Sequence, residues 1–247
     1  GMIGVTAQTG SITTEGDAPI SAKGQLAAEG VVAVDGDIML TAKTDITIGT
    51  VASLEDGVST EVGNIVLTAQ TGKVLLDGTL TTVATAERVG TAFADGNITV
   101  DAATKLTQNA DIKATNGDIA LLARTGDLAQ NANIDVAKGD VSVTAGVTGT
   151  NPATFTGGSI TMASGKSTTI SGEGDIAYRA GTNIKSEILR TNAGDTALTA
   201  NADIVAANAI TTKLGKVDLT AQTGSITTGA MAPISAKGQL AAESLLA

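Results

Sequence analysis

Apolar and polar residues alternate in short segments that each begin with glycine. Ten segments follow the template Gly, any residue, Ile/Val/Thr, any residue, Leu/Val/Met/Tyr, any residue, Ala/Ser, as in GDIMLTA, GNIVLTA and GDIALLA. Alternation with period two is typical of a β-strand with one buried face. We therefore predict ten strands, which start at Gly1, Gly36, Gly63, Gly96, Gly117, Gly139, Gly158, Gly174, Gly194 and Gly215.

The two faces of these strands differ in composition. Apolar residues occupy the first two inward positions, and alanine occupies the third in nine segments, with Ser164 as the exception. Threonine precedes this residue, on the outward face, in six segments. If successive strands lie in register, these threonines stack into a ladder.

Turn phrases follow each predicted strand. Examples are AQTGSI, AQTGKV and ARTGDL, and each is followed by further short apolar segments. The phrase NA(D/N)I recurs at residues 109–112, 131–134 and 201–204, and its first two copies are 22 residues apart, as are Gly117 and Gly139. No helical pattern of ten or more residues separates the strands. Coils of three short strands, wound by turns alone, are therefore expected, as in a parallel β-helix.

The spacing of the start glycines indicates the type of β-helix. Successive intervals are 35, 27, 33, 21, 22, 19, 16, 20 and 21 residues. A left-handed hexapeptide helix would require multiples of six. We predict an all-β, right-handed parallel β-helix of about nine to ten coils, continuous over residues 1–247 and roughly 43 Å long at ~4.8 Å per coil.

The three long intervals carry extra sequence near the start of the chain. We place it at residues 13–35, 49–62 and 79–95 and expect these excursions to project as loops or added strands. Loops carry recognition more often than scaffolds do. If the chain contacts a partner directly, we expect these excursions to make the contact. The favoured alternative is that they only widen one end of the rod.

A longer repeat contains the shorter one. Residues 5–29 match residues 219–243 at 21 of 25 positions, with a constant offset of 214. We interpret residues 1–214 as one long tandem module and residues 215–247 as the start of the next, in a piece of a longer chain. Unpaired strands at the two ends are expected to contact neighbouring modules or to favour end-to-end self-association.

Composition and charge exclude several kinds of partner. The chain has 25 acidic and 15 basic residues, a net charge of −10, and no histidine or cysteine. This charge disfavours nucleic acid and anionic lipid. Two Phe, one Tyr and no Trp provide few rings for stacking. No apolar stretch reaches the roughly 18–20 residues of a membrane span, so no membrane insertion is expected.

Acidic residues beside glycine are the candidates for chemistry. They occur at residues 15–17, 35–37, 55–57 and 173–175, and paired carboxylates can bind calcium. The glycine-rich nonapeptide of calcium-binding β-rolls is absent, and tight turns favour the same residues. Tyr178, the only tyrosine, lies at an inward position and is interpreted as a core residue between Met162 and Leu198. We predict no catalytic, cofactor-binding or metal-binding residues.

The whole chain resembles a known family. Recurrent G(D/N)IxLTAxTGxI phrases, richness in Ala, Thr, Gly and Asn, the absence of Cys and the nested tandem repeats resemble filamentous haemagglutinin and related giant bacterial exoproteins. The resemblance implies a right-handed β-helical fibre, exported by a partner outer-membrane transporter or as an autotransporter passenger. It also implies a secreted or bacterial cell-surface location and adhesion to cells or surfaces. The N-terminal secretion domain of such exoproteins is not recognisable in this sequence.

We therefore expect a structural or adhesive rod module without enzymatic activity, whose partner is a cell-surface or extracellular protein or glycan. One alternative is a β-helical polysaccharide-degrading enzyme or a tailspike-like carbohydrate-binding domain. Such a protein would carry a cluster of exposed carboxylates on adjacent coils, whereas the acidic residues here are spaced one per turn. Another alternative is a passive spacer that displays a binding tip located elsewhere.

Overall fold

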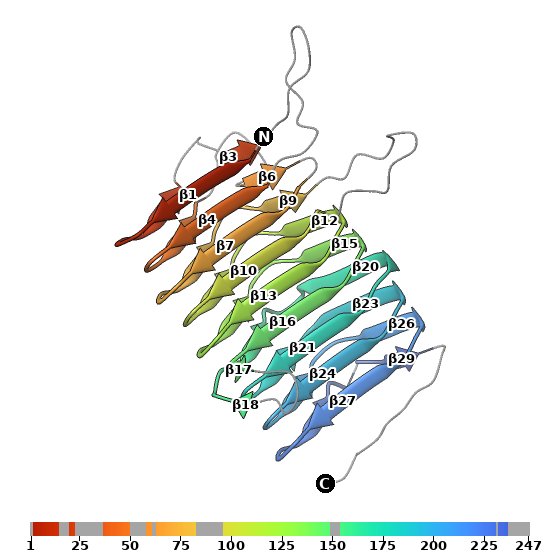
Figure 1. The fold of residues 1–247 in the computed structure, drawn as a ribbon. Helices are drawn as coiled ribbons and strands as arrows, with labels where there is room; N and C mark the ends of the chain where they lie inside the picture. Colours follow the sequence, from red (N-terminus) through yellow and green to blue (C-terminus); the bar gives the residue numbers. More distant parts are fainter. Residues whose placement is uncertain are drawn as a thin grey trace, which may run out of the picture.

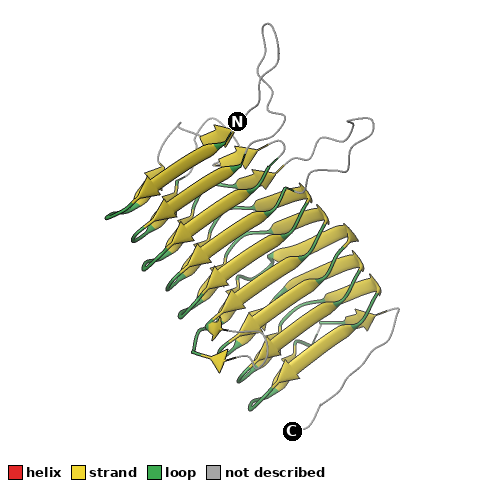
Figure 2. Ribbon diagram, viewed as in Figure 1, coloured by secondary structure: helices red, strands yellow, loops and turns green. Residues whose placement is uncertain are grey.

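The computed structural model describes residues 2–14, 20–22, 37–49, 58–60, 63–82, 96–148, 154–230 and 232–236. The regular structure of these residues is entirely β-strand. The strands form three nine-stranded parallel sheets and one two-stranded hairpin. Figures 1 and 2 show the large sheets as the faces of one continuous stack. The predicted right-handed parallel β-helix is confirmed.

Each sheet contains every third strand of the rod. Sheet A contains β1 (Ile3–Ala7), β4 (Ile38–Ala42), β7 (Ile65–Ala69), β10 (Ile98–Ala102), β13 (Ile119–Ala123), β16 (Val141–Ala145), β21 (Ile176–Ala180), β24 (Thr196–Ala200) and β27 (Val217–Ala221). Sheet B contains β2 (Ile12–Thr14), β5 (Ile46–Ile48), β8 (Val74–Leu76), β11 (Leu106–Gln108), β14 (Leu128–Gln130), β19 (Ile160–Met162), β22 (Ile184–Ser186), β25 (Ile204–Ala206) and β28 (Ile226–Thr228). Sheet C contains β3 (Ile20–Ala22), β6 (Val58–Thr60), β9 (Leu80–Thr82), β12 (Ile112–Asn116), β15 (Ile134–Lys138), β20 (Ser167–Glu173), β23 (Ile188–Ala193), β26 (Ile210–Leu214) and β29 (Ile234–Ala236).

One strand from each sheet makes one coil, which gives nine coils along the rod. Coil 1 contains β1 to β3, and coil 9 contains β27 to β29. The prediction that Gly158 starts a coil is wrong, because the strand that follows it, β19, pairs with β14 and β22 in sheet B. Coil 6 therefore consists of β16, β19 and β20. It also carries an insertion with the hairpin β17 (Val147–Thr148) and β18 (Thr154–Phe155), which the sequence pattern did not reveal.

The core is a column of apolar layers. Ile38, Ile65, Ile98 and Ile119 are paired in register in successive coils, and none is exposed to solvent. Alanine fills the third inward position of sheet A in all nine coils, since the Ser164 exception disappears with the misplaced coil. Its small side chain leaves room for the chain to turn from sheet A into sheet B.

The predicted threonine ladder exists in two runs on the outward face of sheet A. Thr6, Thr41 and Thr68 are paired in register at one end of the rod, and Thr199 and Thr220 are paired at the other. Between these runs the same position is occupied by Asp101, Leu122, Thr144 and Arg179. The outward row is therefore uniform only towards the two ends.

Each of the three excursions contributes an ordinary strand to sheet C. β3 lies within residues 13–35, β6 within residues 49–62, and β9 within residues 79–95. The remainder of each excursion falls largely on residues 15–19, 23–36, 50–57, 61–62 and 83–95, which lie outside the described residues. Added sequence therefore enters the rod next to sheet C in coils 1 to 3.

Start glycines stack on one another at the corner between sheets C and A. The φ angles of Gly117, Gly139, Gly174, Gly194 and Gly215 lie between +133° and +151°. A Cβ on Gly139 would lie 2.2 Å from the carbonyl oxygen of Gly117, and a Cβ on Gly174 would lie 2.0 Å from the carbonyl oxygen of Gly139. Glycine is required here for two reasons, its backbone conformation and the closeness of the preceding coil.

Replacing Gly139 by alanine is expected to lower the free energy of unfolding by about 2 kcal/mol or more, because backbone strain of ~1–3 kcal/mol adds to the collision with Gly117. Urea unfolding followed by circular dichroism measures the change.

Two further variants separate the causes. Gly157→Ala introduces backbone strain, because φ of Gly157 is +97°, but no atom lies within 4 Å of the added Cβ. Gly4→Ala introduces neither strain nor collision, because no atom lies within 4 Å of its Cβ and its φ is not in the left-handed region. We expect the loss of stability to decrease from Gly139 to Gly157 to Gly4. Equal stability of the Gly139 and Gly4 variants would contradict the stacking requirement.

Candidate functional site

A ladder of Asp and Asn side chains follows the stacked glycines. The Oδ1 atom of each residue after the start glycine accepts a hydrogen bond from the backbone N–H of the equivalent residue in the next coil, at 2.6–2.9 Å. The ladder runs through Asp37, Asn64, Asn97, Asp118, Asp140, Asp175, Asp195 and ends at the N–H of Lys216. Each side chain therefore satisfies a backbone donor at a corner where the sheet pairing is interrupted.

This ladder gives the acidic turns a structural role where they are described. Asp37 and Asp175, which belong to two of the candidate turns, are ladder residues. Glu173 is exposed, and its carboxylate lies 3.4 Å from the Lys138 ammonium group. The two other candidate turns, at residues 15–17 and 55–57, and residues 35–36 of the turn that contains Asp37 lie outside the described residues.

Four ladder carboxylates occupy consecutive coils, at Asp118, Asp140, Asp175 and Asp195. We predicted such residues as separate turns, although their constant place after glycine in the sequence indicates a row. Among the residues that the structure describes, no group of three or more acidic, His or Cys side chains is arranged to hold a metal ion.

Two copies of the NA(D/N)I phrase, at residues 109–112 and 131–134, form a second ladder at the corner between sheets B and C. The copy at residues 201–204 instead precedes β25 and lies at the corner between sheets A and B. Asp111 Oδ1 accepts a hydrogen bond from the Asn133 N–H at 3.0 Å, and Asn133 Oδ1 accepts one from the Ser167 N–H at 3.1 Å. The Asn131 amide donates to Asn109 Oδ1 at 2.8 Å. The polar residues of these two copies therefore bond to the adjacent coil.

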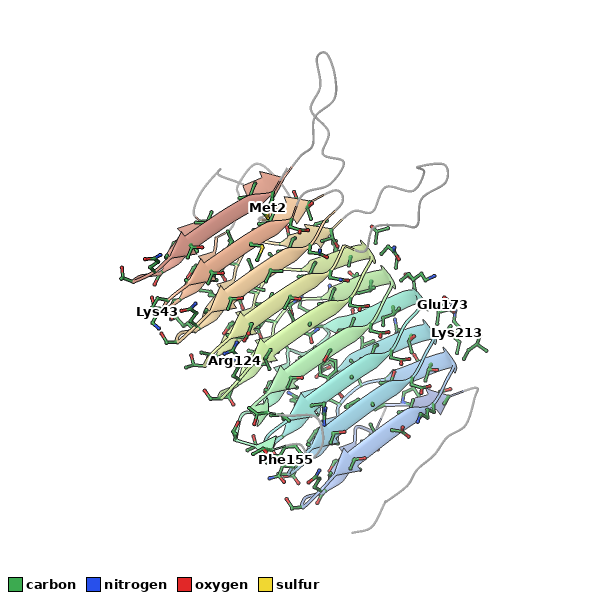
Figure 3. All side chains as sticks on the ribbon, in the orientation of Figure 1. Met2, Lys43, Arg124, Phe155, Glu173 and Lys213 are labelled. Atoms are coloured by element: carbon green, nitrogen blue, oxygen red, sulfur yellow. The ribbon has the colours of Figure 1, made fainter. Side chains whose placement is uncertain are left out.

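Charged side chains also gather at the corners of the rod. Figure 3 shows Lys43 and Arg124 at one corner, and Glu173 and Lys213 at the opposite one. Arg124 Nε donates to Asp101 Oδ1 at 2.8 Å, and its Nη2 atom pairs with Asp101 Oδ2. The hydrogen bond and charge of Asp101 raise the pKa of Arg124. Because the Arg124 side chain is exposed to solvent, this bidentate ion pair contributes little to the free energy of unfolding.

Tyr178 is part of a buried polar cluster. Its side chain is fully buried, as predicted, but its register neighbours are Val143 and Leu198 instead of Met162 and Leu198. The hydroxyl donates to Gln130 Oε1 at 2.6 Å and lies 2.6 Å from the Thr168 hydroxyl. Desolvation by burial raises the pKa of the Tyr178 phenol, and the hydrogen bonds with Thr168 and Gln130 oppose this rise.

A groove of about 330 Å³ crosses the outward face of sheet C over coils 3 to 6. The register places Lys113 between Thr81 and Asp135, and Asp135 beside Thr169, so these side chains form a row along the rod axis. The groove is lined by hydroxyl residues, one cation, one anion and small apolar residues, namely Thr81, Thr82, Lys113, Ala114, Thr115, Asp135, Val136, Ala137, Thr169 and Ser171.

Small residues and a β-bulge shape this groove. Ala137 contributes only a methyl group to the lining. Beside it, the pairing of β20 with β23 shifts register between Ile170 and Glu173. Gly172 lies in this bulge, where a Cβ would come within 2.5 Å of the Ala137 carbonyl oxygen. The bulge changes the course of the strand at the edge of the groove.

The charges in the groove influence one another. Partial burial raises the pKa of Asp135, the negative charge of Asp111 raises it further, and the positive charge of Lys113 opposes the rise. Hydroxyls, an ammonium group and a carboxylate at strand spacing provide both donors and acceptors of hydrogen bonds. The groove therefore offers both donors and acceptors of hydrogen bonds beside a lining surface that is mostly apolar.

The sequence analysis located only one edge of the groove. Thr81 and Thr82 belong to the predicted excursion at residues 79–95, so that contact region and the groove meet at β9. Lys113, Asp135 and Thr169 were missed, because an outward polar residue on a regular strand looks the same in sequence whether or not it lines a groove.

Comparisons of the chain with protein-family models, with curated proteins and with solved structures gave no match. Among the described residues, no helix has the length and apolar character that a membrane span requires.

The single tyrosine makes the buried cluster measurable in solution. Because its pKa is raised above that of the unfolded chain, about 10, Tyr178 favours the folded state below that pH, and this contribution is lost as the pH rises further. We expect tyrosinate absorbance at 295 nm to appear together with loss of the β-sheet signal. A simple titration near pH 10 in the folded chain would contradict the buried cluster.

The corner ladder predicts a second measurable effect. Asp140→Ala removes the acceptor of the Asp175 N–H and is expected to lower the free energy of unfolding by about 1 kcal/mol. Asp140→Asn retains an acceptor oxygen at the same place and should preserve most of the stability. An equal loss in both variants, measured by urea unfolding, would show that the charge matters and the hydrogen bond does not.

Proposed function

We propose that this chain is a structural and adhesive rod module of a very large secreted or cell-surface bacterial protein. The observation that carries the proposal is the continuous parallel pairing of strands in three sheets over nine coils. A stack of this kind spans about 38 Å at ~4.8 Å per coil interval, and its length increases with each added coil. The likeness of the repeated phrases to filamentous haemagglutinin supports the same function.

The contact surface in this proposal is the outward face of sheet C. The excursions connect to strands of this sheet, and the groove begins at β9, where the third excursion starts. The partner is a cell-surface glycan or protein that offers hydroxyl or amide groups to Lys113, Asp135 and the neighbouring hydroxyls. A rod that presents such a face can hold the partner at a distance from the rest of the polypeptide.

A polysaccharide-degrading enzyme is the less supported alternative. Glycoside hydrolysis generally requires two carboxyl groups across the scissile bond. The part of the groove that the structure describes is lined by one carboxylate, that of Asp135. The stacked aspartates lie at a different corner, and their Oδ1 atoms already accept backbone hydrogen bonds.

The test is binding of the whole chain, coupled to fluorescent beads, to bacterial cells, animal cells and a glycan array. Ala137→Arg places a long side chain in the groove and is expected to reduce binding at least tenfold. Ala197→Arg is the matched control, because Ala197 faces outward on β24 in sheet A, pairs with Asp218 and lies away from the groove.

The outcomes separate the candidate functions. Binding that Ala137→Arg abolishes and Ala197→Arg preserves supports an adhesive groove. Absence of binding to every surface favours the passive spacer, and binding that is insensitive to Ala137→Arg would remove the groove from the proposal. Shortening of a polysaccharide by the chain would favour the enzyme.

A further inference from the structure

The two ends of the rod expose layers that are buried elsewhere. Within the described residues, β1 pairs only with β4, and β27 pairs only with β24. Val5 is 40% exposed although it lies at an inward position, whereas its partner Leu40 is 0% exposed. Leu219 in β27 is likewise only partly buried. Each end therefore combines an apolar layer with a strand edge that can accept another strand.

The two edges are complementary in their backbone groups. In the body of the rod, the N–H of the first inward residue of each sheet-A strand donates a hydrogen bond to the next coil. The acceptor is the carbonyl oxygen of the residue that directly precedes the sheet-A strand of that coil. The Ile3 N–H donates to the Asp37 carbonyl at 2.8 Å, and the Thr196 N–H donates to the Lys216 carbonyl at 2.9 Å. By this rule the Val217 N–H points out of coil 9, and the equivalent acceptor at the other end of the rod is the Met2 carbonyl.

Because of the repeat in the sequence, the free face at each end of the rod has an equivalent face that is packed against another coil inside the rod. Coil 9 repeats coil 1 at an offset of 214 residues. The free face of coil 9 therefore repeats the face of coil 1 on which coil 2 is stacked. Conversely, the free face of coil 1 repeats the face of coil 9 that is stacked on coil 8. Both free faces thus have the composition of an interface between coils.

The threonine row fits the same contact. Its two runs lie at opposite ends of the rod, with Thr199 and Thr220 in coils 8 and 9, and Thr6, Thr41 and Thr68 in coils 1 to 3. Stacking coil 9 on coil 1 would join them into one continuous row of five threonines.

We propose that the free face of coil 9 binds the free face of coil 1 in a second copy of this chain. In this contact β27 lies parallel to β1, with Val217 opposite Ile3, Leu219 opposite Val5 and Ala221 opposite Ala7. The contact is head-to-tail, so it leaves a free face at each end of the dimer and propagates into filaments. It is independent of the adhesive function and of the groove.

One corner of this interface lacks a ladder bond. Lys216 occupies the ladder position of coil 9 and has no acceptor oxygen in its side chain. Met2 occupies the same position in coil 1, and its thioether is at most a weak acceptor towards coil 2. Coils 1 and 2 nevertheless stack in register through all three sheets. The missing bond therefore does not prevent stacking.

The absence of cysteine from the chain allows a direct test by disulfide cross-linking. A tagged Thr220→Cys chain is mixed with an untagged Thr6→Cys chain and oxidised. Adjacent strands lie ~4.8 Å apart, which is within the Cα separation that a disulfide spans. We expect the mixed dimer to form at least tenfold faster than a mixture of Thr220→Cys with Thr144→Cys, which carries its thiol in mid-rod.

A double variant, Thr199→Cys with Thr220→Cys, is the positive control, because these residues are already paired within one chain. If this variant closes its internal disulfide while the Thr220→Cys and Thr6→Cys mixture forms mixed dimer no faster than the mid-rod control, the proposal is overturned.

Sedimentation velocity provides a second measurement without cysteine. The mass of the unmodified chain is expected to rise with concentration. Thr228→Pro should reduce this rise, because the Thr228 N–H points to the free edge of β28, whereas Thr228→Ala should leave it unchanged. A mass that stays monomeric at every concentration, or an equal rise in all three chains, would contradict the head-to-tail contact.

Discussion

The structure depends on the parallel pairing of each coil with the next at the spacing of β-strands, ~4.8 Å. Because a coil has no other coil to pack against than its two neighbours, every residue must fit directly on its equivalent in the adjacent coil. Inside the rod this condition stacks Ile on Ile and Ala on Ala. At the corner before sheet A it requires glycine, because a Cβ on Gly139 or Gly174 would collide with the glycine of the preceding coil. The frequent recurrence of Ile, Ala and Gly in the sequence is therefore a direct result of the stacking of equivalent residues.

The same condition determines where polar groups occur. Sheet pairing satisfies the backbone along the strands but is interrupted at the corners, where Asp, Asn and Thr side chains provide the missing partners in adjacent coils. Inside the prism, the polar side chains of Gln130, Thr168 and Tyr178 are partners of one another within the core. Corners and core thus solve the same problem with different residues, and both solutions tie together residues that are far apart in the sequence.

Sequence periodicity was sufficient to predict the fold class, the inward strand faces and the alanine column, because these follow from residue type at period two. It failed in coil 6, since Gly158 begins a segment that fits the template but belongs to sheet B. A strand pattern reports which face is buried, and it does not report which of three sheets the strand joins. The partners of Tyr178 and the groove could not be predicted for a similar reason. They depend on contacts across coils, and the register of those contacts is shifted by an insertion of unpredictable length.

The position of the groove follows from a change in the third sheet along the rod. The sheet-C strands of coils 1 to 3 contain three residues each, whereas β12 and β15 contain five and β20 contains seven. Coils 1 to 3 therefore have a short sheet-C strand and extra sequence beside it, whereas coils 4 to 6 have a longer sheet-C strand. The groove lies where these two kinds of coil meet, beside the bulge of β20 and the methyl group of Ala137. A regular solenoid offers nearly the same surface at every coil, so a change of this kind distinguishes one stretch of the rod from the others.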